Sequence, residues 1–461
     1  MHTLLLIDDD RDARFLMARL LKKAGWQVLE AEDGDTGLEL LAKSQPEVVL
    51  CDLMMPRCNG FQFCRSVRGR GAGFPQPKII IATASDYASD RTNALEAGAN
   101  EVLVKPVRSE DLLRTLAGLA SPDNKSASAV KPATISTDGP ASPSAPTTGF
   151  HRADHGVSVK FWGVRGSIPT PGPATAIYGG NTTCVEVRAD GELIILDAGT
   201  GIRPLGLQLV SEFKGQPLDL TVLMTHTHWD HIQGFPFFIP AYNPKNQLHI
   251  LGYEGARKGL ENTLSSQMES PYFPISMQQM PGNISIQELR EMKFAVGRVQ
   301  VQAQFMNHPG ICAGYRLDTS AGSIAFLPDN EPFQRLKAHT SAQVGPDQAE
   351  AQAYARRQDE KLIAFLRDVD VLIMDSQYDA TEYPQRVGWG HACVDDTVAI
   401  ALSANVKKLF LFHHDPGHDD AYIARMEVHA RELVAQNGGT LIVEAAREGA
   451  VCVLAPKRER A

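Results

Sequence analysis

The chain has 461 residues, enough for two to four domains that each bury their own core. Its 43% hydrophobic and 21% charged residues are typical of a globular protein, and a formal net charge of −9 argues against an extended basic surface for nucleic acid. The seven cysteines are odd in number and form no CxxC pair, which indicates free thiols in a reducing compartment. No leader-like segment and no apolar run of membrane-spanning length is found, so we expect a cytoplasmic protein without membrane contact.

Residues 1–120 alternate short apolar runs with segments of helical periodicity. The expected strands are 4–7, 28–29, 48–51, 79–82 and 102–104, and the expected helices are 11–23, 35–43, 61–67, 89–97 and 109–119. Such β–α repeats predict a five-stranded parallel doubly wound sheet, an α/β fold with helices on both faces. Ligands of these sheets bind at the carboxyl ends of the strands.

Five polar residues stand at those strand ends. They are Asp8, Asp9, Asp52, Thr83 and Lys105. Three carboxylates at one edge repel each other unless a cation lies among them, and an oxygen-rich site of this kind suits Mg²⁺. A lysine and a threonine hydroxyl beside them could hold a phosphoryl group.

This constellation, with Met54-Met55-Pro56 after Asp52 and Pro106 after Lys105, closely resembles the receiver domain of bacterial two-component response regulators. The resemblance implies phosphorylation of Asp52 by a cognate histidine kinase, Mg²⁺ at Asp8 and Asp9, and contacts from Thr83 and Lys105 to the phosphoryl group. One position departs from the family, because Val102 stands where receivers usually carry an aromatic switch residue. A receiver-shaped module that is never phosphorylated is the alternative.

Residues 121–150 are rich in Ser, Pro, Ala and Thr and have almost no large apolar side chain. Such a segment cannot bury enough surface to fold and is expected to be a flexible linker, with a mean span of about 30 Å. A second domain is then expected over residues 151–461.

The second domain opens with expected strands at 157–162, 183–187, 192–196 and 220–224. Asp197 follows the third of these, where capping a turn and supporting a neighbouring site are equally good interpretations. The fourth leads into Thr-His-Thr-His-Trp-Asp-His at 225–231. Unpartnered buried polar groups cost about 1–3 kcal/mol each, so three imidazoles and a carboxylate in one loop point to metal ligation rather than to folding. The His-x-His spacing places two imidazoles on one side of an extended segment.

The loop resembles the His-x-His-x-Asp-His signature of the metallo-β-lactamase fold, an αββα sandwich that holds one or two transition metals. Three later strand ends match the family's remaining ligands: His308 after 299–305, Asp329 after 324–327 and His413 after 409–412. The resemblance implies one metal on His226, His228 and His308, a second on Asp230, His231 and His413, and a bridging Asp329. Zinc is expected first, with manganese and iron as alternatives.

Two further segments resemble the ribonuclease Z-like, phosphodiesterase branch of this fold. Asp375 would orient His391, and His391 would donate a proton to the leaving oxygen or bind the scissile phosphate. The match is partial, because Asp375 replaces the usual Glu and Met374 the usual His. A hydrogen bond at the start of a helix is the other interpretation of His391.

The predicted function is a phosphorylation-regulated, dinuclear metal-dependent phosphodiesterase, with Asp230 or Asp329 as proton acceptor. The region 151–461 carries a net charge of −7, which disfavours long nucleic acid and favours a small phosphodiester or cyclic nucleotide. The alternatives are hydrolysis of a lactone, thioester or other acyl substrate, and a catalytically silent signalling adaptor. Homodimerisation is left open.

Overall fold

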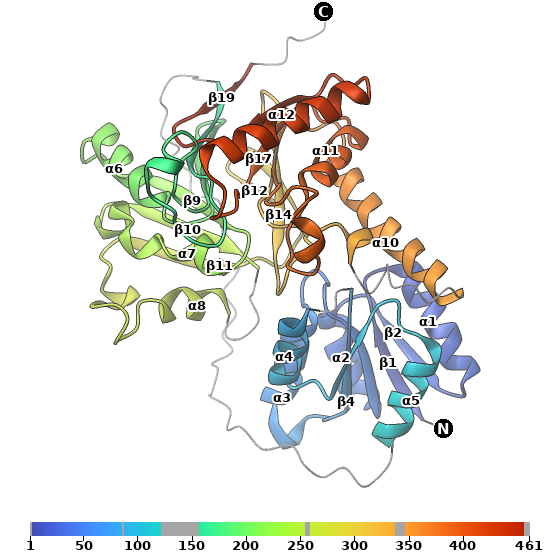
Figure 1. Cartoon of the computed structure of the whole chain (residues 1–461). Coiled ribbons are helices and arrows are strands. Elements are labelled where there is room, and N and C mark those ends of the chain that lie inside the picture. The colour runs from blue at the N-terminus through green and yellow to red at the C-terminus, as the bar shows by residue number, and fades with distance from the viewer. Residues whose placement is uncertain (1, 85–86, 121–155, 254–258, 337–345, 456–461) are drawn as a thin grey trace, which may run out of the picture. The chain divides into compact units, whose positions relative to one another are not determined.

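The computed structural model describes residues 2–84, 87–120, 156–253, 259–336 and 346–455. The chain divides into two compact units, each with its own sheets and core (Figure 1). The expected linker at 121–150 lies outside the described residues. Among the helices within those ranges, none is both long enough and apolar enough to cross a bilayer.

The first unit is the five-stranded parallel sheet predicted from the sequence. Its strands are β1 (Thr3–Ile7), β2 (Gln27–Ala31), β3 (Val48–Asp52), β4 (Lys78–Thr83) and β5 (Glu101–Val104), and its helices are α1 (Arg11–Lys23), α2 (Gly34–Ser44), α3 (Gly60–Gly69), α4 (Ala88–Ala97) and α5 (Ser109–Ala120). The strand order is β2-β1-β3-β4-β5, so the direction of winding reverses between β1 and β3. Asp8 and Asp52 therefore stand at the switch point where such sheets bind ligands.

Alternation along β1 divides its side chains between two layers of helices. Leu4 and Leu6 belong to the core that includes Ala18 and Leu21 of α1 and Leu112 of α5. Ile7, the next residue after Leu6, packs on the opposite face, where a Cβ added to Gly37 of α2 would meet its side chain. Both faces of the sheet are covered, which is why its strands are almost continuously apolar.

The second unit contains two seven-stranded sheets. The first sheet has the order β11-β10-β9-β8-β7-β6-β19 and the second β12-β13-β14-β15-β16-β17-β18. The strands are β6 (Val157–Gly163), β7 (Cys184–Ala189), β8 (Glu192–Leu196), β9 (Asp219–Met224), β10 (Gln247–Gly252), β11 (Asn283–Glu288), β12 (Lys293–Val296), β13 (Val299–Phe305), β14 (Ala313–Asp318), β15 (Ser323–Leu327), β16 (Val371–Asp375), β17 (Lys408–Phe412), β18 (Ile442–Ala445) and β19 (Val451–Leu454).

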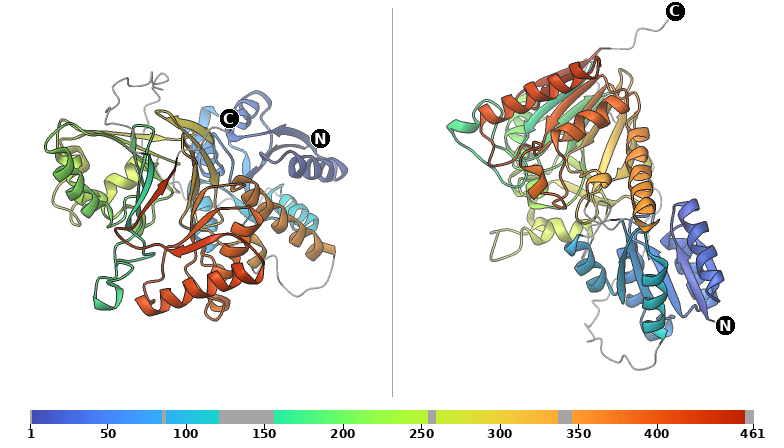
Figure 2. Two further views of the ribbon diagram at one scale, coloured as in Figure 1. Left: turned by 90° about the horizontal axis from the view of Figure 1, so that it is seen from above. Right: turned by 45° about the vertical axis from the view of Figure 1, so that its right-hand side comes forward.

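The two sheets of this unit pack face to face, with helices on their outer sides (Figure 2). Phe161 of β6 lies 4.8 Å from Phe410 and 6.2 Å from Phe412 of β17 between ring centroids, joining the sheets through aromatic contacts. The covering helices are α6 (Ile202–Phe213) and α8 (Leu260–Ser266) on the first sheet and α10 (Pro346–Phe365), α11 (Val394–Ser403) and α12 (Asp420–Gln436) on the second. The expected αββα sandwich is confirmed.

Strand direction in the second sheet places the polar loops at one edge. β13 and β15 are both antiparallel to β14 and therefore run the same way, and β15, β16 and β17 are parallel to one another. The segments that follow β13, β15, β16 and β17 consequently leave the sheet at the same edge. These segments begin with the histidines and carboxylates predicted to bind metal.

Candidate metal centre and receiver site

The loop predicted to bind metal begins where β9 ends and turns into the short helix α7 (Trp229–Ile232). His226 and His228 precede the helix, with His228 in extended backbone at its N-terminus, while Asp230 and His231 lie on its first turn. Within this loop the direction of the chain changes between the two pairs. One segment can therefore supply ligands to two adjacent points.

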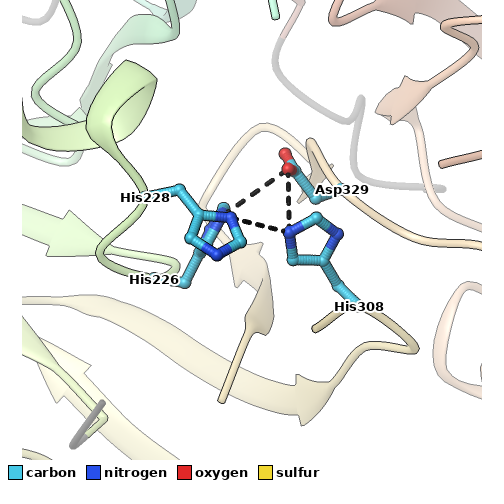
Figure 3. A group of neighbouring side chains, drawn as sticks. All are labelled: His226, His228, His308 and Asp329. Atoms are coloured by element: carbon cyan, nitrogen blue, oxygen red, sulfur yellow. Dashed lines mark hydrogen bonds and ion pairs between the residues drawn. The ribbon is translucent and has the colours of Figure 1, made fainter. Parts of the chain in front are cut away.

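Three imidazole nitrogens converge on a single point (Figure 3). Nδ1 of His228 lies 3.0 Å from Nε2 of His226 and 3.0 Å from Nε2 of His308. Oδ2 of Asp329 completes the group, at 3.6 Å from Nε2 of His226 and 3.5 Å from Nε2 of His308. Three nitrogens and one carboxylate oxygen at these separations form a four-ligand set suited to a transition metal.

A second group lies on the other side of Asp329. Nε2 of His413 lies 3.0 Å from Oδ2 of Asp230 and 3.4 Å from Oδ1 of Asp329. Nε2 of His231 is 3.3 Å from each of the same two oxygens. Asp329 thus presents one carboxylate oxygen to each group, as a bridging ligand would.

The residues present fit a pair of divalent metals. Nε2 of His231 and Oδ1 of Asp329 are buried and have no hydrogen-bond partner in the described structure, although such atoms are costly to leave unpaired. Burial holds the pKa values of His226 and His308 well below the usual range, so both rings are neutral and offer lone pairs. Burial raises the pKa of Asp329, but the surrounding imidazoles outweigh it and keep the group ionised. Neutral imidazole and carboxylate are the donors that zinc, manganese and iron accept.

Outer partners fix the orientation of these rings. Nδ1 of His231 donates to Oδ2 of Asp197 over 2.8 Å, Nδ1 of His308 donates to the carbonyl of Gly390 over 2.9 Å, and Nδ1 of His413 lies 3.2 Å from Oε1 of Gln377. Each contact engages Nδ1 and leaves Nε2 to face the proposed metal, as the hydrogen-bond partners of metal-ligating histidines usually do. Asp197 makes contacts that fit both of its expected roles, since it accepts from the Thr225 amide over 2.7 Å and also contacts the His231 ring.

Three residues around the centre hold left-handed backbone. The φ angles of Ser167, Asp197 and His413 are 64°, 60° and 62°. Non-glycine residues persist in this region where their surroundings over-determine them, typically at functional sites. At Ser167 this conformation aims the backbone amide at Oδ2 of Asp230, 2.7 Å away. The strain therefore serves to place a ligand and its donor.

Replacing Asp197 with asparagine is expected to lower metal affinity about 10- to 100-fold, the usual cost of losing an outer partner. The side-chain amide nitrogen of asparagine accepts no hydrogen bond, so Thr225 and His231 compete for the one remaining oxygen and the His231 ring loses its fixed orientation. Isothermal titration of the metal-free protein with Zn²⁺ measures the change. Asp318→Asn is the matched control, because Asp318 is the last residue of β14 and lies at the end of that strand away from the ligands. This variant should bind metal like the wild type. Unchanged affinity in Asp197→Asn would contradict the supporting role.

His391 and Asp375 stand beside the two ligand groups. Nδ1 of His391 donates to Oδ2 of Asp375 over 2.9 Å, and the His391 ring stacks 5.0 Å from that of His413. Asp375 follows the apolar run of β16 and is fully buried. Burial disfavours the charged imidazole, but Asp375 outweighs it and raises the pKa of His391 to about 9. Asp375 therefore fixes the orientation of the His391 ring through Nδ1 and leaves Nε2 without a contact to this carboxylate.

The sequence did not reveal several residues that support this arrangement. Glu331 is fully buried and accepts hydrogen bonds from the amides of Gly388 and Gly390 at 2.8 Å each and from the Tyr383 hydroxyl at 2.7 Å. Gln377 lies between His413 and Asp415. Glu331 comes two residues after Asp329, and this closeness to a predicted ligand is the sequence signal that could have identified it as a supporting residue.

The receiver residues gather at the predicted edge of the first unit. Oxygens of Asp8, Asp9 and Asp52 lie within 4.8 Å of one another. Nζ of Lys105 lies 2.8 Å from Oδ2 of Asp8 and 3.0 Å from Oδ1 of Asp52. Burial, reinforced by the two neighbouring carboxylates and opposed by Lys105, raises the pKa of Asp52 to about 7. A divalent cation at this point would offset that repulsion.

The remaining receiver positions are buried beside this group. Thr83 ends β4 and is 3% exposed. Val102 is 5% exposed within β5, so the position of the usual aromatic switch is occupied by a small core side chain. Its carbonyl accepts a hydrogen bond from Arg91 over 3.0 Å.

Comparison with known proteins agrees with both units. Residues 4–117 match the model of the response regulator receiver domain, and residues 193–414 match that of the beta-lactamase superfamily domain. The response regulator MprA of Mycobacterium sp. (strain KMS) is 41% identical over 123 residues, which are 26% of this chain and 52% of that protein. The chain thus matches about half the length of such curated relatives.

Solved structures resemble the second unit. The metallo-beta-lactamase fold protein YhfI from Bacillus subtilis is 16% identical with a TM-score of 0.44, covering 64% of this chain and 98% of its own. A diphosphatase from the PhnP family is 15% identical with a TM-score of 0.44, covering 65% of this chain and 100% of its own. From these matches and the two folds, residues 4–117 form a response regulator receiver domain, and residues 193–414 belong to a metallo-β-lactamase-fold domain of the beta-lactamase superfamily.

Proposed function

We propose that this protein is a cytoplasmic two-component response regulator whose second domain is a dinuclear metal-dependent phosphodiesterase acting on a small phosphodiester. The observation that carries the proposal is the division of Asp329 between two ligand groups, with the His391–Asp375 pair beside them. A protein that only bound a partner would have no need of an oriented proton donor beside a ligand set of five histidines, of which only His228 is exposed. The free state of all seven cysteines agrees with a reducing compartment.

His226, His228 and His308 would hold one metal, Asp230, His231 and His413 the other, and Asp329 both. Bound divalent metals supply Lewis-acid stabilisation of phosphoryl charge and a water nucleophile that is ionised near neutral pH. Zinc fits the donor set best, and manganese and iron accept the same ligands.

The chain's own groups then position and protonate the substrate. The Ser167 amide donates to Oδ2 of Asp230 and fixes this carboxylate, which would accept a proton from the attacking water. Nδ1–H of His391 is committed to Asp375, which leaves Nε2–H to donate to the leaving oxygen. Asp375 also accepts from the Asn330 and Gln377 amides at 3.1 and 3.0 Å, so it cannot turn away from His391.

Hydrolysis of bis(p-nitrophenyl) phosphate by the metal-loaded full chain tests the proposed activity. Turnover is expected with Zn²⁺, Mn²⁺ or Fe²⁺ and should be lost in Asp230→Ala. Activity in Asp230→Ala equal to wild type would place the chemistry elsewhere. No turnover with any of the three metals would favour an acyl substrate, with lactones tested next, or a non-catalytic adaptor.

The receiver would take its phosphoryl group from a histidine kinase onto Asp52 with Mg²⁺ held by Asp8 and Asp9. In Asp52→Asn, labelling by radioactive acetyl phosphate is expected to fall to background, because the acceptor carboxylate is replaced by an amide. Hydrolase activity of the wild type should change on phosphorylation, whereas that of Asp52→Asn should not. Asp35→Asn, on the first turn of α2, is the matched control. Stable labelling of Asp52→Asn would assign the phosphoryl group to another residue.

A further inference from the structure

A short segment beside the metal centre presents an aromatic surface that the chemistry above does not use. Tyr383–His391 lies within the connection from β16 to α11 and ends at the proposed proton donor. Within it the indole of Trp389 is 54% exposed, although the next residue but one is buried. A large exposed aromatic residue directly beside a catalytic group suggests a role in recognition.

The backbone on both sides of Trp389 is anchored from below. Glu331 accepts from the Gly388 and Gly390 amides, each over 2.8 Å, and is itself completely buried. Added Cβ atoms at Gly390 would lie 2.4 Å from Pro309 and 2.6 Å from Nδ1 of His308, so this backbone packs directly on the proposed ligand loop. The backbone on either side of Trp389 is therefore fixed before any ligand arrives, which reduces the ordering cost of binding.

Arg386 covers part of the Trp389 ring. Its guanidinium carbon lies 4.5 Å from the Trp389 centroid and 5.9 Å from that of Tyr378, whose ring is 6.2 Å from His391. Within the described residues Arg386 forms no ion pair. An unneutralised cation is thus stacked on an exposed indole, close to the proton donor, in a region of net negative charge.

We propose that Trp389 and Arg386 form a stacking platform for a flat aromatic group, such as a nucleobase, carried by the phosphoester that binds at the metal centre. The inference rests on the proposed function and narrows its substrate class to nucleotides. Arg386 stacks on the indole, whose exposed part is available for a base. The cation strengthens the platform for an electron-rich ring and for a nearby phosphate.

The test compares the binding of adenosine 5′-monophosphate and ribose 5-phosphate to the metal-loaded full chain by isothermal titration calorimetry. The two ligands share the phosphate and the sugar, so their difference reports the base. The wild type is expected to bind the nucleotide roughly 5- to 150-fold more tightly, the range of one base–aromatic stack. In Trp389→Ala this preference should vanish while ribose 5-phosphate affinity stays the same, and Trp389→Phe should keep part of it.

Phe15→Ala, which removes another exposed aromatic side chain, is the matched control and should retain the preference. Equal binding of the two phosphates by the wild type, or no measurable binding of either, would overturn the proposal. So would equal weakening of both ligands in Trp389→Ala, since that would show a structural role for the loop. These binding measurements need no turnover. A protein that prefers the nucleotide but hydrolyses no diester would contradict only the proposed phosphodiesterase activity. A protein that hydrolyses diesters but binds both ligands equally would contradict only the stacking platform.

Discussion

Replacing Asp329 with alanine is expected to weaken both metal sites together, each by more than about 100-fold, since losing an outer partner alone costs 10- to 100-fold. The reason is the division of its carboxylate, with Oδ2 at 3.5 Å from Nε2 of His308 and Oδ1 at 3.3 Å from Nε2 of His231. The remaining histidines would also lose the negative charge that offsets two cations. Metal content after dialysis, measured by mass spectrometry, and Zn²⁺ titration report the loss.

Asp318→Ala is the matched control for this experiment. Asp318 ends β14 on the far side of the sheet from the ligands, where it bonds Gln302 and Arg316 at the surface. It should retain two equivalents of metal. Loss of one metal alone from Asp329→Ala would show that Asp329 belongs to a single site, and retention of both would exclude it as a ligand.

The second large effect is expected at His391 and depends on the leaving group. Without a proton donor, His391→Asn should cleave a diester with an alkoxide leaving group about 10²- to 10⁴-fold more slowly. The rate at which this variant hydrolyses bis(p-nitrophenyl) phosphate should fall less than tenfold, because p-nitrophenolate leaves without protonation. Steady-state kinetics on the two substrates, with metal content measured in parallel, gives the comparison.

Asp375→Asn should show the same dependence with a smaller loss, since the imidazole remains but loses the carboxylate that holds its proton. Equal losses on both substrates would assign His391 to phosphate binding instead of proton transfer. Loss of metal from His391→Asn would show that His391 is a metal ligand. Its ring nitrogen lies close enough to the ligand atoms of Asp329 and His413 for that role.

Strand ends were the part of the site that sequence reasoning could reach. An apolar run followed by a lone His or Asp was the pattern at 308, 329 and 413, and strands β13, β15 and β17 end three, two and one residues before them. Resemblance to known families then gave the pairing of these residues into two groups. The strand boundaries followed from alternation and burial, which are local properties.

The supporting residues escaped because their partners are distant and partly main-chain atoms. The Gly390 carbonyl orients His308 across 82 positions, and Glu331 reaches Gly388 across 57. No periodicity encodes such contacts. The sequence alone does not distinguish the two roles of Asp197 for the same reason, since only the fold brings its carboxylate to 2.8 Å from Nδ1 of His231.

The origin of the ligands in two separate sheets has a consequence for how the protein acquires metal. His226 follows a strand of the first sheet, whereas His308, Asp329 and His413 follow strands of the second. Neither sheet alone carries a complete set, so tight binding arises only once both have formed and packed together. Metal then binds the native chain and stabilises it by mass action. Neither sheet is expected to bind the ion tightly by itself before the sandwich has formed. Removal of the metal by a chelator should lower the melting temperature of this domain without changing its topology.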